Sequence, residues 1–223
     1  MIIDKIEQSF FTSTRWTGLP CTSITSSLTN RITKTSPESS SQSALTPKAI
    51  HETLEQILIS AKSPFNNLWF HGGEPLLQIE SFKNLIEQLP KKKAPIYLET
   101  NGSLPNYLKE IMEHIHGLSV TIFPEFSSES IETIQAWLYS KKGINNLSIN
   151  IPIKKGFIAQ DLSATFQWIQ SIDPNIFVCL VPTPNFIRKE TATPKKDILR
   201  ALALSKKYLK TIKVTPDINH ILK

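Results

Sequence analysis

Residues that could do chemistry gather in the segment 68–77, LWFHGGEPLL, where an apolar run ends in His71, a glycine pair and Glu74. Two adjacent glycines let the backbone approach a ligand closely, because no Cβ stands in the way. The backbone carbonyls and the carboxylate of Glu74 can accept hydrogen bonds from an ammonium group. The same residues would also suit a plain strand-to-helix turn, so this segment alone leaves both interpretations open.

A second polar group, the segment 98–103, LETNGS, follows the next apolar run. Asn-Gly is also a common turn dipeptide. Two such motifs at successive strand ends are more specific than either one, because consecutive parallel strands place their C-terminal ends side by side. We therefore expect one small-molecule site built from both motifs. Its expected ligand-binding residues are Gly72, Gly73, Glu74, Asn101 and Gly102, together with His71 and Thr100.

The elements that position these motifs follow an alternating pattern from residue 45 onward. Short β-branched runs predict strands at 21–25, 67–70, 96–99, 118–123, 146–151, 176–181 and 211–215. Amphipathic segments predict helices from residue 46 and over 77–89, 105–114, 128–141, 160–172 and 194–209. This alternation is typical of an α/β fold with a parallel sheet and right-handed crossovers. About six βα units are too few for a closed eight-fold barrel, so we expect one domain over 1–223 that forms an open, partial barrel.

Composition narrows the class of protein. The net charge is +6, but the lysines are scattered and no aromatic residues interleave with them, so no nucleic-acid surface is expected. Two cysteines do not make a disulfide scaffold and fit a cytoplasmic protein, in which both are small core residues. The chain lacks a stretch of ~20 apolar residues, so no membrane span is expected. The polar, serine-rich segment 34–45 predicts a flexible loop.

The segment 68–77 resembles the strand-end Gly-Gly-Glu-Pro motif of radical S-adenosylmethionine enzymes, which meets the amino group of the cofactor's methionine moiety. Within that superfamily the chain is similar to the 7-carboxy-7-deazaguanine synthase family. This similarity lies in TGLPCT at 17–22, Asn30 and VTIFPE at 120–125. The resemblance implies a partial (β/α)6 TIM-like barrel of the radical S-adenosylmethionine type. It also implies that the strand-end residues include a cofactor-binding set and a substrate-binding pair. The cofactor-binding positions are Gly72, Gly73, Glu74, Asn101, Gly102, Phe123, Pro124 and Glu125, and the substrate-binding positions are His71 and Thr100.

Several residues depart from the family pattern. The family's cluster cysteines have the spacing C-x3-C-x2-C, and Thr29, Thr33 and Ser36 occupy these positions. Neutral hydroxyls cannot replace the three thiolates of a 4Fe–4S cluster, so no cluster is expected. Glu38 occupies the position near the family's Mg²⁺, but a lone carboxylate in a polar loop does not make a magnesium site. Thr25 occupies the position of the substrate-binding arginine and cannot make a bidentate contact.

These departures bear directly on function. The family's Q-G-E-G substrate segment is matched by FTST at 11–14, which has neither its carboxylate nor its glycines. We therefore expect the chain not to form 7-carboxy-7-deazaguanine, a queuosine precursor, by the family mechanism. Three interpretations stay open: a pseudoenzyme with a remnant S-adenosylmethionine or nucleotide-like pocket of weakened affinity, an interaction protein built on the same barrel, and a lyase that is active with help from a partner. The resemblance makes a homodimer the default.

Overall fold

The computed structural model describes residues 2–12, 14–26, 28, 45–59, 64–89, 94–123, 128–140, 143–182 and 192–215. Its strands are β1 (Ile3–Phe10), β2 (Pro20–Ser26), β3 (Leu68–Gly72), β4 (Ile96–Thr100), β5 (Ile115–Thr121), β6 (Leu147–Ile153), β7 (Phe177–Pro182) and β8 (Ile212–Val214). Its α-helices are α1 (Pro47–Ile59), α2 (Ile79–Gln88), α3 (Pro105–Ile111), α4 (Ser128–Tyr139), α5 (Ala159–Ile172) and α6 (Lys195–Ser205). The short 3-10 helices are η2 (Pro75–Gln78), η3 (Met112–His114) and η4 (Ile144–Asn146).

The strands described by the structure form a single eight-stranded sheet in the order β1-β2-β3-β4-β5-β6-β7-β8. Strand β1 pairs antiparallel with β2, and every following pair is parallel. Within the described residues β1 and β8 are the two edges, so the sheet is open. The predicted α/β class, the open sheet and the predicted order of strands and helices are confirmed, with one strand more than expected.

Strand β1 was missing from the sequence-based prediction, and its register explains why. The pairing with β2 shifts between Ile3 and Lys5, so one residue is inserted at Asp4. The inserted residue breaks the period-2 alternation by which a strand is recognised. Charged residues at positions 4, 5 and 7 hide the pattern further.

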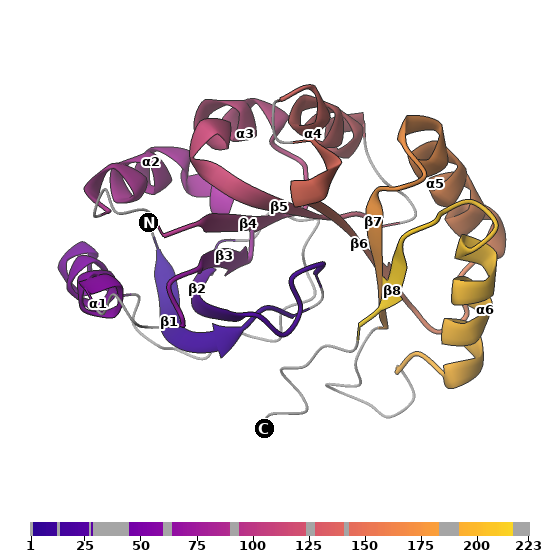
Figure 1. Ribbon diagram of the computed structural model, residues 1–223, viewed down its shortest axis with the longest axis horizontal. Helices are drawn as coiled ribbons and strands as arrows, with labels where there is room; N and C mark the ends of the chain where they lie inside the picture. Colours follow the sequence, from indigo (N-terminus) through magenta and orange to yellow (C-terminus); the bar gives the residue numbers. More distant parts are fainter. Residues whose placement is uncertain are drawn as a thin grey trace.

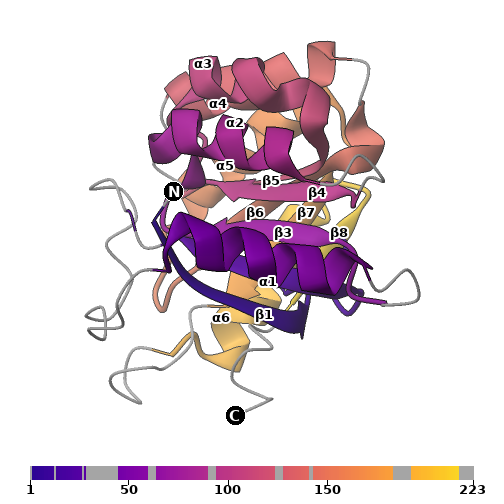
Figure 2. The same ribbon diagram turned by 90° about the vertical axis from the view of Figure 1, so that its left-hand side faces the viewer.

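The six α-helices lie along the outer side of the curved sheet, as Figure 1 shows, and Figure 2 shows α1 running in front of β1. The main hydrophobic core fills the space between helices and sheet. One example is the Phe70 ring of β3, which packs on Phe82 of α2 with 4.6 Å between ring centroids. Among the residues described, no helix is long and apolar enough to cross a membrane.

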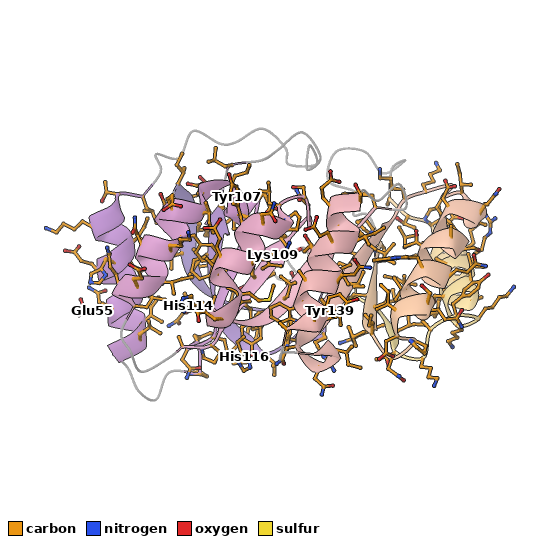
Figure 3. The ribbon with its side chains drawn as sticks, turned by 90° about the horizontal axis from the view of Figure 1, so that it is seen from above. Glu55, Tyr107, Lys109, His114, His116 and Tyr139 are labelled. Carbon is orange, nitrogen blue, oxygen red and sulfur yellow. The ribbon has the colours of Figure 1, made fainter. Side chains whose placement is uncertain are left out.

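The outward side of the helices carries polar and aromatic side chains. Figure 3 looks onto this side and labels Tyr107, Lys109 and Tyr139, which belong to α3 and α4. Lys109 forms an ion pair with Glu132 across these two helices, with 2.7 Å between nitrogen and oxygen. Tyr139 is 89% exposed.

Candidate functional site

The turn after β3 is pressed against the end of β2. The amide of Gly73 donates to the carbonyl of Ser26 at 2.8 Å, and the amide of Glu74 donates to the carbonyl of Leu28 at 2.6 Å. Gly72 has φ +98°, and a Cβ there would lie 2.5 Å from the carbonyl oxygen of Ser26. Only glycine fits this contact, so Gly72 serves the close packing of two strand ends.

The carboxylate of Glu74 joins the ends of β3 and β4. It accepts hydrogen bonds from the Thr100 hydroxyl at 2.9 Å, from the Asn101 amide at 2.8 Å and from the Leu76 amide at 3.1 Å. The side chain is fully buried, and this burial raises the pKa of the carboxyl group to about 7 despite these donors. The geometry therefore gives Glu74 a structural role, and a ligand's ammonium group would have to meet other acceptors.

The turn after β4 is fixed in a similar way. Gly102 has φ +76°, its amide donates to the Thr100 hydroxyl at 3.1 Å, and its carbonyl accepts from the Thr133 hydroxyl at 2.7 Å. The Asn101 side chain accepts from the amide of Ser103 at 2.9 Å. The two motifs are thus directly linked, as their positions at adjacent strand ends led us to expect. The Thr100 hydroxyl is already held by Glu74 and Gly102.

His71 lies on the inner face of the sheet, the face without helices. Its Nε2 is 2.6 Å from the Ser23 hydroxyl and 3.4 Å from the Thr25 hydroxyl. The imidazole stacks on the indole of Trp69, with ring centroids 3.9 Å apart. Burial lowers the pKa of His71 to about 4, so the ring is neutral at neutral pH. A half-buried neutral imidazole can donate or accept a hydrogen bond, but it does not offer a positive charge.

Below His71, an aromatic cluster closes the inner side near the N-terminal ends of the strands. The cluster consists of Phe11, Trp16, Trp69 and Tyr97, together with the buried Cys21. The rings of Phe11 and Tyr97 are 4.8 Å apart, as are those of Trp16 and Tyr97. Gly117 makes room for them, because a Cβ there would lie 2.6 Å from both Trp16 and Tyr97. Phe11, from the segment matched to the family's substrate motif, is therefore a core residue.

Above the aromatic cluster, one side chain from each of the seven parallel strands forms a polar row across the inner face. Strand register pairs Thr25 with His71, Thr121 with Asn150, Asn150 with Cys179, and Cys179 with Lys213. Register places Ser119 beside Glu99, so the row steps two residues along β5 at this point, and the Thr121 hydroxyl joins the two strands by donating to the carboxylate of Glu99 at 3.3 Å. We call this set of residues the polar row: Thr25, His71, Glu99, Thr121, Asn150, Cys179 and Lys213.

Solvent reaches the polar row at several points. Thr25, His71, Glu99 and Thr121 are half-buried, and Lys213 is exposed. In closed eight-stranded parallel barrels, the inner layers are usually filled by branched apolar residues. A row of hydroxyl, imidazole, carboxylate, amide and ammonium groups in that position is suited to hydrogen bonding with a small polar ligand.

The remaining candidates from the sequence divide into two groups. Phe123 follows β5, and the Lys154 ammonium lies 5.4 Å from the centroid of its ring. The candidates in the second group lie outside the described part of the chain: Pro124 and Glu125, the three cluster positions Thr29, Thr33 and Ser36, and Glu38. The described residues contain no group of three or more His, Cys, Asp or Glu side chains that could hold a metal ion.

Both cysteines are buried, as predicted. Burial raises the pKa of Cys21 to about 12 and that of Cys179 to about 11. Neither thiol is therefore a nucleophile at neutral pH.

Sequence reasoning missed most of the polar row, including Glu99, Asn150 and Lys213. Their signal was a polar residue between two apolar ones within a strand, such as Leu98-Glu99-Thr100 or Ile149-Asn150-Ile151. Alternation predicts that such a residue faces away from the main core. It does not show which residue of the next strand lies beside it.

Comparison with known proteins indicates a distant relationship to 7-carboxy-7-deazaguanine synthase. The enzyme of Thermococcus kodakarensis is 26% identical over 91 residues, which cover 41% of this chain and 34% of that protein. The enzyme of Methanopyrus kandleri is 31% identical over 107 residues, which cover 43% of this chain and 42% of that protein. The matches thus span less than half the length of these curated relatives. No protein-family model matches the chain.

Proposed function

We propose that this protein is a diverged relative of 7-carboxy-7-deazaguanine synthase that binds a small nucleoside-like ligand without an iron–sulfur cluster. In this proposal the sheet is a partial barrel of the radical S-adenosylmethionine type, and the ligand lies on its inner face. The distant relationship to two synthases supports the family. The link through the buried Glu74 holds the two strand-end motifs side by side, which is the arrangement that one shared ligand site needs.

The chemistry of the donor set does not fit a 4Fe–4S cluster. Thr29, Thr33 and Ser36 offer neutral hydroxyl groups at the positions of the family's thiolates. Hydroxyls do not bind iron in this way, because such clusters need anionic sulfur ligands. Without a cluster, radical cleavage of S-adenosylmethionine has no source of the electron. We therefore propose a binding function and no family lyase activity.

The observation that carries the proposal is the polar row above the aromatic cluster. Thr25, His71, Glu99 and Thr121 are half-buried and Lys213 is exposed, so these five side chains can offer donors and acceptors to a ligand. Asn150 and Cys179 are buried and lie beneath them. His71 stacks on the buried Trp69, so its imidazole is the aromatic ring that this face offers to a ligand. A nucleoside base is a flat ring with polar edges, so it suits stacking on the imidazole and hydrogen bonds to the polar row.

Calorimetric titration of the metal-free protein with S-adenosylmethionine tests the proposal. We expect saturable binding in the micromolar range that is lost in Gly73→Val, because a bulky side chain at the β3 turn would block the approach to the strand ends. Ala203→Val, on the exposed side of α6, is the matched control and should bind normally. Circular dichroism establishes that both variants fold.

Two results would contradict the proposal. Absence of binding up to millimolar concentration would favour the interaction-protein interpretation. Formation of 5′-deoxyadenosine after anaerobic treatment with iron and sulfide would show that a cluster forms after all, and that the lyase interpretation holds.

A further inference from the structure

The positive charge of the chain is concentrated in its C-terminal part. Residues 143–223 contain twelve Lys and Arg residues against five Asp and Glu residues, whereas residues 1–142 contain thirteen against fourteen. The net charge of +6 therefore comes from the part of the chain that forms β6, β7 and β8 with α5 and α6. Such an asymmetry favours a polyanionic partner. The expectation of no nucleic-acid surface relied on the scatter of lysines along the sequence, and the fold gathers several of them.

Five cations lie on the outward side of α6 and of the turn that follows it. The amides of Lys206 and Lys207 donate to carbonyls of α6 at 3.2 Å, so this turn continues the course of the helix. An α-helix has about 3.6 residues per turn, so Lys196, Arg200 and Lys207 share one side of it. All five side chains are exposed. We call this set of residues the α6 basic face: Lys195, Lys196, Arg200, Lys206 and Lys207.

Carboxylates do not neutralise the α6 basic face in the described part of the chain. Asp197 is the one acidic residue within 192–215, and its buried carboxylate accepts a hydrogen bond from the Gly156 amide at 3.0 Å. The ion pairs between described residues involve none of the five cations. By contrast, Lys109 of α3 is paired with Glu132 of α4. The α6 basic face is therefore available to an external anion.

The other residues of α6 narrow the class of polyanion. A helix that binds in a membrane surface exposes an apolar side. In α6 the apolar side packs on the core through Ala201, Leu202 and Leu204, and Leu199 is the large apolar side chain left exposed. None of the exposed residues of α6 is aromatic, so the bases of a single strand would find no ring to stack on. The phosphate backbone of a duplex needs only positive charges, which this face supplies.

We infer that the α6 basic face binds the phosphate backbone of a nucleic-acid duplex, independently of base sequence. The exposed residues of α6 include no hydroxyl or amide side chain that could recognise a 2′-hydroxyl group, so duplex DNA and duplex RNA should bind alike. Figure 1 shows α6 in the outer layer of helices, whereas the polar row lies on the inner face of the sheet. The inference is therefore independent of the proposed small-molecule site.

Fluorescence anisotropy with a labelled DNA duplex of arbitrary sequence, measured over a range of salt concentrations, tests this inference. The test variant combines Lys196→Gln, Arg200→Gln and Lys207→Gln. The control variant removes the same charge at three exposed lysines outside the α6 basic face: Lys5→Gln, Lys48→Gln and Lys109→Gln. Circular dichroism establishes that both variants fold.

We expect the duplex to bind at low salt and to dissociate as salt is added. At about 0.9 per phosphate contact, five contacts predict a slope of about −4.5 for the logarithm of the association constant against that of the salt concentration. The test variant should lower the magnitude of this slope by about 2.7 and weaken binding at low salt at least about tenfold. The control variant should keep the slope, and duplex RNA should behave as duplex DNA does.

Several results would overturn the inference. Absence of duplex binding at low salt would show that the face does not bind nucleic acid, and equal weakening in both variants would show that only the overall charge matters. Phosphatidylserine vesicles and polyglutamate are the competing polyanions. If either displaces the labelled duplex as well as unlabelled duplex does at equal charge, the face suits a membrane surface or an acidic protein instead.

Discussion

Replacing Glu74 by glutamine should change how the stability of the protein depends on pH. The buried carboxyl group has a pKa raised to about 7, from an ordinary value of 4.5. A higher pKa in the folded state means that the folded protein binds this proton more tightly. The resulting stability is fully present below pH 4.5 and is lost as the pH rises through 7. At about 1.4 kcal/mol per pH unit, the difference between a pKa of 4.5 and one of about 7 corresponds to roughly 3 kcal/mol of unfolding free energy.

His71 acts in the opposite direction. Its pKa is lowered to about 4 from 6.5, so the folded protein resists protonation of the ring. Stability from this group is present above pH 6.5 and is lost as the pH falls through 4. Between pH 4.5 and 6.5 the two contributions oppose each other in the unmutated protein. The difference between the unmutated protein and Glu74→Gln isolates the carboxyl group.

The assay is urea unfolding, followed by tryptophan fluorescence, at intervals between about pH 4.5 and 8. We expect the stability advantage of the unmutated protein over Glu74→Gln to shrink by roughly 3 kcal/mol across this range. At the acidic end the variant should be less stable by about 1–3 kcal/mol, because its amide group faces the backbone N–H of Asn101. Glu80→Gln, at an exposed position in α2, is the control. If the unfolding free energies of Glu74→Gln and of the unmutated protein change in parallel with pH, the pKa of Glu74 is not raised in the folded state.

Three further predictions follow from the site geometry. Gly72→Ala should destabilise the protein more than Gly156→Ala. Both glycines have positive φ, but only at Gly72 would the new Cβ meet backbone atoms of Ser26. Equal urea midpoints for the two variants would count against this contact. The imidazole of His71 should stay neutral down to about pH 5 in a nuclear magnetic resonance titration, since its pKa is about 4; a midpoint near its ordinary value would be inconsistent with burial. Cys21 and Cys179 should react with a thiol reagent only after unfolding, because both are buried, and rapid labelling of the native protein would contradict their placement.

Much of the fold could be predicted from the sequence because its signals are local. Each predicted strand from 67–70 onward is a short apolar run, and each helix has an amphipathic pattern, so their order followed directly. Strand β1 was not predicted, because its register shift and its charged residues remove the alternation of apolar and polar residues. The link between the two strand-end motifs was predictable, since consecutive parallel strands end side by side.

The details of the site were less predictable because they depend on contacts between distant residues. Glu74 was expected to face a ligand, and only the structure shows its carboxylate turned toward Thr100 and Asn101. The polar row depends on the register of seven strands, as in the pairing of Cys179 with Lys213. No sequence pattern states that register, so the members of the polar row could not be recognised as one set in advance.

Titration of the protein with S-adenosylmethionine in the presence of a metal chelator shows whether this molecule binds without an iron–sulfur cluster. We expect saturable micromolar binding that the chelator does not change, because in the proposed site the ligand contacts come from side chains and backbone of the inner face. Binding that appears only after reconstitution with iron and sulfide, together with cleavage of the bound molecule, would contradict it.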